Sequence, residues 1–162
     1  MKPLEFGPGV WTGLIADLRR RGQGRRESGA FLLGCETEAV KFVETWLPYD
    51  ELDPASLNYD YIRLETSAFP KLWAHCEARG VQVVADVHTH PGMPEQSESD
   101  QAYPMVSISG HVALIVPWFA RAGVTPADLS FNVYLGGGEW DSKFRQEAAD
   151  LIKLGEDDQH GR

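Results

Sequence analysis

The sequence has little cysteine and little positive charge, and it contains no long apolar run. Its two cysteines, Cys35 and Cys76, lie far apart and outside any C-x-x-C pair, which excludes a structural zinc site built from clustered cysteines. Lys and Arg number 15 against 24 Asp and Glu, and the formal net charge is -9. Phosphate backbones repel such a surface, so we expect no nucleic-acid partner. No apolar stretch approaches the roughly 20 residues that span a bilayer, so we expect no membrane span.

The remaining composition is that of a globular protein. Hydrophobic residues make up 43% and charged residues 24% of the 162 residues, which suits one domain with a core of its own. The first 22 residues lack the continuous apolar segment of a signal peptide. Two cysteines outside any motif suit a reducing compartment. We therefore expect a cytoplasmic protein.

Apolar periodicity and turn residues predict an α/β fold, a mixed β-sheet flanked by helices. Residues 1–155 are expected to form one domain, and residues 156–162 are expected to be a frayed C-terminal tail. A loop is predicted over 49–59, and 61–65 is compatible with a strand. Helices are predicted over 8–21, 67–79 and 145–154, and strands over 28–35, 40–47, 81–88, 112–116 and 129–135, with a short strand near Trp140.

One segment carries residues suited to metal chemistry. His88 and His90 stand two apart at the end of a predicted strand, so both side chains point to the same face and can converge on one ion. A Pro-Gly pair then turns the chain. Ser97 and Asp100 have the spacing of a helix start, with Ser97 as N-cap. A turn that folds this helix start over the strand end would bring the Asp100 carboxylate beside the two histidines.

Two histidines and one carboxylate are the ligand set of a catalytic zinc site, which keeps its fourth position for water. Such a site also needs a general base, and in metalloproteases the base is usually a glutamate. Each piece alone has a structural interpretation: an H-x-H pair is often incidental, and a Ser-x-x-Asp pair is often only a helix cap. The combination favours a metal site.

The combination of His-Thr-His-Pro, Ser-x-x-Asp and an upstream Glu resembles the JAMM motif of the JAB/MPN metalloproteases. The stretch Glu27-Ser-Gly-Ala-Phe-Leu-Leu-Gly is similar to the family's opening Glu and the strand after it, and the resemblance covers about residues 8 to 150. It implies that His88, His90 and Asp100 hold one Zn²⁺ per chain. It implies that Glu27 is the general base and that Ser97 stabilises the oxyanion.

The resemblance also implies a single MPN (JAB) domain that hydrolyses a peptide or isopeptide bond after the C-terminus of ubiquitin or a ubiquitin-like protein. The sequence is most similar to bacterial JAB peptidases that accompany E1-like, E2-like and ubiquitin-like proteins, including antiviral defence systems, so such proteins are the expected partners. Five residues, 92–96, separate the His-Thr-His-Pro stretch from Ser97, whereas the best-known eukaryotic members have six, so the substrate-facing loop is expected to differ.

Two other functions fit the same residues. The first is a peptidase that processes a sulfur-carrier-type ubiquitin-like protein, and the second is a non-catalytic MPN scaffold that only binds partners. A thermolysin-like protease would need H-E-x-x-H and a nucleobase deaminase would need P-C-x-x-C, and the sequence has neither. His75, His111 and His160 are weaker candidates; His111 starts a strand and could approach the site, but nothing in the sequence requires it.

Overall fold

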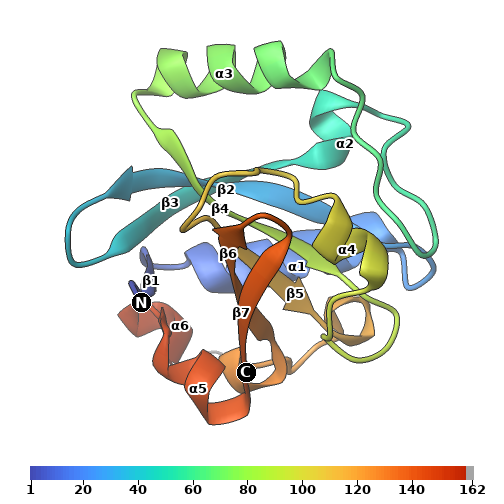
Figure 1. Ribbon diagram of the computed structural model, residues 1–162. Helices are drawn as coiled ribbons and strands as arrows, with labels where there is room; N and C mark the ends of the chain where they lie inside the picture. Colours follow the sequence, from blue (N-terminus) through green and yellow to red (C-terminus); the bar gives the residue numbers. More distant parts are fainter. Residues whose placement is uncertain (160–162) are drawn as a thin grey trace.

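The computed structural model describes residues 1–159, in which eight strands form one mixed sheet (Figure 1). The strand order is β7-β6-β5-β4-β2-β3-β1-β8. The β4–β5, β1–β3 and β1–β8 pairs are parallel, and the other pairs are antiparallel. The strands are β1 (Leu4–Phe6), β2 (Gly29–Glu36), β3 (Lys41–Pro48), β4 (Gln82–Thr89), β5 (Val112–Val116), β6 (Ser130–Gly136), β7 (Glu139–Phe144) and β8 (Ile152–Lys153).

Helices cover both faces of the sheet, with α1 on one face and α2 and α3 on the other (Figure 1). Successive side chains of a strand point to opposite faces. In β2, Leu32 therefore packs in the core under α1, whereas Phe31 and Leu33 pack in the core under α3. The helices are α1 (Val10–Gly22), α2 (Tyr49–Leu52), α3 (Ala68–Arg79), α4 (Glu98–Ala102), α5 (Arg145–Asp150) and α6 (Glu156–Gln159), with 3₁₀ turns at Trp118–Ala120 and Pro126–Asp128.

The α/β class and the longer elements agree with the sequence prediction, and the differences concern short elements. The strands β1 and β8 have three and two residues, too few for a periodic pattern, and they form because β1 pairs with β3 and with β8. The expected loop after β3 begins as the helical turn α2. Residues 61–65 form no strand, only an isolated bridge between Leu57 and Ile62. The helix predicted over 145–154 ends at Asp150 and is followed by β8.

The predicted frayed tail is helical where the structure describes it. Glu156–Gln159 form α6, and Asp158 is buried there. Its Oδ1 accepts hydrogen bonds from the backbone N–H and the hydroxyl of Thr12 on α1. This contact between the two ends of the chain holds the segment in place, which composition alone does not reveal. Residues 160–162, including His160, lie outside the described residues.

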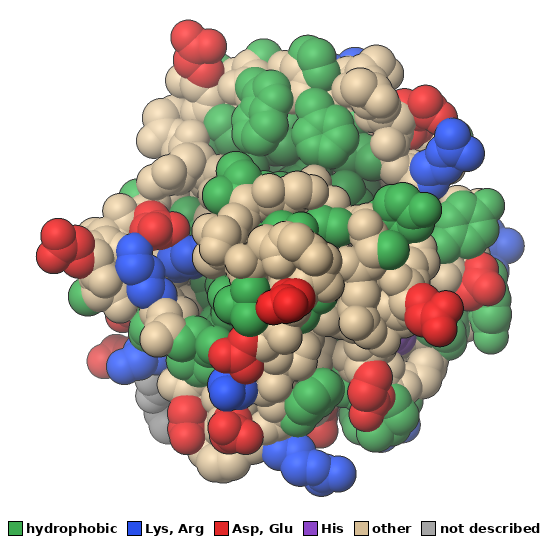
Figure 2. All heavy atoms as spheres, viewed as in Figure 1, with side chains coloured by type: hydrophobic (Ala, Val, Ile, Leu, Met, Phe, Trp, Pro, Cys, Tyr) green, Lys and Arg blue, Asp and Glu red, His purple; other side chains and the backbone are tan. Residues whose placement is uncertain are grey.

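Two further features concern basic surface charge and membrane-spanning helices. Basic side chains are dispersed over the face shown in Figure 2, where they form no continuous patch. Within residues 1–159, no helix combines the length and the apolar character that crossing a bilayer requires.

Replacing Gly34 by alanine is expected to destabilise the protein strongly, because an added Cβ would collide with the backbone carbonyl of Phe42. Gly34 lies where the register between β2 and β3 shifts, and the neighbour is backbone that a rotamer change cannot move. We expect a loss at the upper end of the ~1–3 kcal/mol typical of overpacking. Chemical denaturation measures it. Gly92→Ala is the matched control, because its Cβ would meet open space; equal losses in the two variants would contradict this explanation.

Candidate metal centre

The two histidines of the motif are positioned by the central strand β4. His88 is paired with Gly29 of β2 and with Ile115 of β5, and the backbone N–H of His90 donates to the Val116 carbonyl. Their side chains, 14% and 12% exposed, place the two Nε2 atoms 3.1 Å apart. The structure therefore brings these two side chains together at the end of β4.

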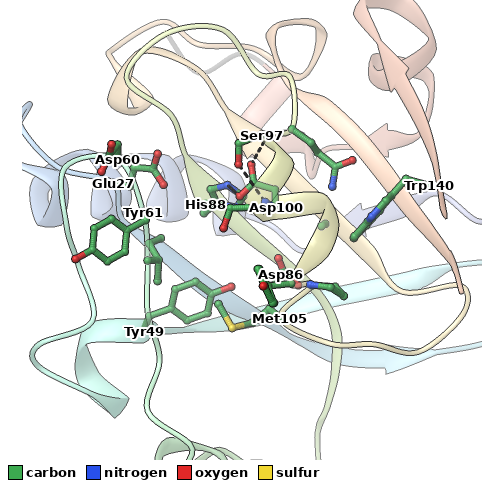
Figure 3. A pocket seen from close by; sticks show the side chains of 16 residues that line it. Glu27, Tyr49, Asp60, Tyr61, Asp86, His88, Ser97, Asp100, Met105 and Trp140 are labelled. Carbon is green, nitrogen blue, oxygen red and sulfur yellow. Dashed lines mark hydrogen bonds and ion pairs between the residues drawn. The ribbon is translucent and has the colours of Figure 1, made fainter. Parts of the chain in front are cut away.

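Asp100 reaches the histidines because Ser97 caps α4 as the sequence predicts. The Asp100 backbone N–H donates to Ser97 Oγ at 3.0 Å, and the Ser97 backbone N–H donates to Asp100 Oδ2 at 2.8 Å. This reciprocal cap orients the carboxylate toward β4 (Figure 3). Asp100 Oδ1 lies 3.3 Å from His88 Nε2, and Oδ2 lies 3.1 Å from His90 Nε2.

The donor atoms of His88, His90 and Asp100 fit a tetrahedral metal ion. His90 Nδ1 lies 3.2 Å from the Met93 carbonyl. A carbonyl only accepts hydrogen bonds, so Nδ1 carries a proton and Nε2 is the ring nitrogen that faces the site. Bonds of ~2.0–2.1 Å to a tetrahedral zinc ion hold neighbouring ligand atoms about 3.3 Å apart, close to the separations of 3.1–3.3 Å seen here.

Glu27 forms a second possible metal-binding group with the same two histidines. It lies two residues before the start of β2, its backbone N–H donates to the Asn58 carbonyl at 2.8 Å, and its side chain is buried. One of its carboxylate oxygens and one ring nitrogen each of His88 and His90 lie within 4.8 Å of one another. Asp100 is in direct contact with both rings, whereas Glu27 is placed more loosely. The geometry therefore favours Asp100 as the third ligand and leaves Glu27 within reach of a water between them.

The two carboxyl groups of the centre, Glu27 and Asp100, have pKa values shifted in opposite directions. Burial raises the pKa of Glu27 from 4.5 to about 7, although the nearby His88 and His90 oppose this shift. Burial also opposes ionisation of Asp100, but hydrogen bonds from both histidines and from the Ser97 backbone hold the pKa of Asp100 well below its usual range. At neutral pH Asp100 is therefore an anion suited to binding a cation, whereas Glu27 can both accept and release a proton.

Hydrogen bonds between Ser28, just before β2, and Thr89 of β4 fix Glu27 relative to the histidines. The backbone N–H of Ser28 donates to Thr89 Oγ1 at 2.9 Å, and the Thr89 N–H donates to the Ser28 carbonyl at 2.8 Å. The Ser28 hydroxyl also donates to the Leu18 carbonyl at 2.7 Å, and Ser28 and Thr89 are fully buried. These hydrogen bonds were not predicted from the sequence, where the threonine between the two histidines is the residue that indicates them.

Sequence reasoning also missed the buried Asp86 and assigned His111 no partner. His111 Nε2 lies 2.6 Å from Asp86 Oδ2, so His111 contacts this carboxylate. The signal was a lone aspartate within the apolar strand β4. His75 lies on α3, which does not carry any of the site residues. Asp86, Glu27, His88 and Asp100 line one cavity of about 100 Å³ (Figure 3).

Replacing Glu27 by glutamine is expected to stabilise the metal-free protein above pH 7. A carboxyl group whose pKa rises from 4.5 to about 7 on folding binds its proton more tightly in the folded state. Below pH 4.5 both states are protonated and nothing is lost; between the two values stability falls, and above pH 7 the full cost is present. Glutamine removes this titration.

Thermal unfolding in a chelator at pH 4.5 and pH 8 measures the effect. We expect the variant to melt higher than the wild type at pH 8 and close to it at pH 4.5. Glu36→Gln is the control of opposite sign, because a hydrogen bond from Lys2 lowers the pKa of Glu36. A Glu27→Gln variant that is less stable at pH 8 would contradict the raised pKa.

The arrangement can be compared with known proteins. The fold is similar to the solution structure of protein DSY2949 from Desulfitobacterium hafniense, with a TM-score of 0.69 and 16% sequence identity over 97% of each chain. A stretch of 43 residues is 42% identical to the "Probable metalloprotease y4jG" of Sinorhizobium fredii, and this match spans 26% of each protein. Residues 10–131 match the family model described as prokaryotic homologs of the JAB domain. That match covers most of the chain, which therefore belongs to the prokaryotic JAB-domain family.

Proposed function

We propose that the protein is a zinc-dependent peptidase that cleaves a peptide or isopeptide bond after the C-terminus of a ubiquitin-like protein. The observation that carries this proposal is the convergence of His88, His90 and Asp100, with Glu27 beside them, at a cavity that Glu27, His88 and Asp100 line. Family membership supports a metal-dependent peptidase. The ubiquitin-like substrate and the E1-like and E2-like partners follow from the JAMM resemblance of the sequence.

His88, His90 and Asp100 would hold the zinc ion. When bound, zinc polarises a carbonyl group and lowers the pKa of a water toward neutrality. Glu27 accepts the proton of the attacking water and delivers it to the nitrogen of the leaving amine, a dual role that suits a pKa of about 7. The hydroxyl oxygen of Ser97 accepts the Asp100 N–H, which leaves its hydrogen free to donate to the carbonyl oxygen as negative charge develops.

The test is cleavage of a linear ubiquitin-like fusion and of an isopeptide-linked ubiquitin dimer by the zinc-loaded protein. We expect cleavage after the C-terminal residue of the ubiquitin-like part, lost with chelator and restored by zinc. Cleavage of a sulfur-carrier fusion alone would assign the alternative processing role. A protein that binds no zinc and cleaves neither substrate would instead be the non-catalytic scaffold.

A further inference from the structure

The cavity beside the metal centre has a polar floor and apolar walls. Asp86 of β4 and Ala113 of β5, which are register partners, and Tyr49 of α2 contribute to its base. Apolar side chains contribute to the walls, and two exposed tyrosines and a tryptophan contribute to the mouth. The wall residues are Ile62, Pro104 and Met105, and the mouth residues are Tyr61, Tyr103 and Trp140.

One buried hydroxyl at the floor lacks a hydrogen-bond partner, and it lies beside the Asp86 carboxylate. The Tyr49 hydroxyl is buried, with the residue 1% exposed, and it makes no hydrogen bond within the described part of the chain. Figure 3 shows it pointing toward Asp86. His111 takes one Asp86 oxygen, Oδ2, and leaves Oδ1 for another donor. A buried hydroxyl without a partner is costly, so Tyr49, with the Asp86 carboxylate lining the same cavity, is suited to a ligand that donates hydrogen bonds to both.

The charge of the cavity favours a cation. Its lining contains the four carboxyl groups of Glu27, Asp60, Asp86 and Asp100 but neither lysine nor arginine among the described residues. The zinc ion would offset the charge of Asp100. Asp86 makes no hydrogen bond to His88 or His90 among the described residues, and His111 contacts its Oδ2, so its Oδ1 is the oxygen that can face another cation.

We propose that Tyr49 and Asp86 form a subsite that receives the cationic side chain of a lysine next to the scissile bond of the substrate. The unbranched stem of lysine would lie along Ile62 and Met105, and its ammonium group would donate to Asp86 Oδ1 and the Tyr49 hydroxyl. The tyrosines and Trp140 at the mouth add favourable contacts with a passing cation. This subsite deepens the proposed peptidase function and rests on it for the identity of the substrate.

The probe is Nα-acetyl-lysine methylamide, titrated at pH 7 into ¹⁵N-labelled, zinc-loaded protein while the indole signal of Trp140 is followed by NMR. The matching norleucine compound has the same stem without the charge. We expect saturable binding of the lysine compound and at least about ten-fold weaker binding of the norleucine compound. Binding requires no turnover, so it is independent of peptidase activity.

Two variants locate the site. Tyr49→Phe removes only an unpaired hydroxyl and should fold normally, and we expect it to weaken lysine binding about three- to ten-fold. Asp86→Asn removes the charge and should weaken binding at least about ten-fold; if loss of the His111 contact unfolds it, Tyr49→Phe still decides. The control is Glu98→Gln, which removes one exposed charge on the neighbouring α4 and should leave binding unchanged.

Equal affinity for the lysine and norleucine compounds, or lysine binding that Tyr49→Phe leaves intact, would overturn the subsite. The two proposals fail in different ways. Selective lysine binding by a protein that cleaves no substrate would retain the subsite and reject the peptidase. If the cleavage rate stays the same when every lysine near the scissile bond is replaced by norleucine, the peptidase proposal stands and the subsite is rejected.

Discussion

Replacing Glu27 by glutamine is expected to lower kcat for peptide hydrolysis by at least about 100-fold while the fold and the bound zinc remain. A positioned general base contributes typically ~10²–10⁴-fold, and glutamine keeps the size of the side chain but cannot accept the proton. Asp100, not Glu27, is in direct contact with both histidine rings, so zinc affinity should change little. Cleavage assays at saturating substrate, with zinc measured by elemental analysis on the same samples, test both statements.

The control for this prediction is Glu36→Gln, which makes the same chemical change at the exposed far end of β2, the strand that follows Glu27. It should retain full activity. If Glu27→Gln cleaved substrate at the wild-type rate, the general-base role would be wrong. If it lost zinc together with activity, Glu27 would be a ligand, as its grouping with the two histidines also permits.

The sequence predicted the ligand cluster well because its members are local. His88 and His90 share one strand face, and Ser97 and Asp100 share one helix start, so only a turn between the two segments is needed to bring the three proposed ligands together. Both features are found in the structure. The roles of these residues stay predictions until metal and activity are measured.

Glu27 is different because 88 − 27 = 61 positions separate it from His88. Its place beside the histidines depends on the antiparallel pairing of β2 with β4, in which Gly29 lies opposite His88. Spacing carries no information on which strands pair, so only the family resemblance indicated Glu27 beforehand. The floor of the cavity is equally non-local, since Tyr49 joins Asp86 in its lining from the helical turn α2, in a segment predicted to be a loop.

Replacing His88 or Asp100 by alanine is expected to lower zinc affinity by more than the ~10–100-fold that loss of a supporting residue costs, because each change removes one of three ligands. Wild-type protein incubated with zinc should retain about one ion per chain, and the variants should retain almost none after dialysis. His75→Ala is the matched control, since His75 lies on α3 and is not one of the residues lining the metal-site cavity.

The two ligand variants should differ in the metal-free state, which gives a second test of the same geometry. Asp100 supports the cap of α4 and contacts both histidines, so its loss removes contacts of Ser97, His88 and His90 together. Loss of His88 leaves that cap intact. We therefore expect Asp100→Ala to melt lower than His88→Ala in chelator, although both lose zinc. Unchanged zinc content in either variant would refute the ligand assignment, whereas equal melting temperatures would show that the cap contributes little to holding the site together.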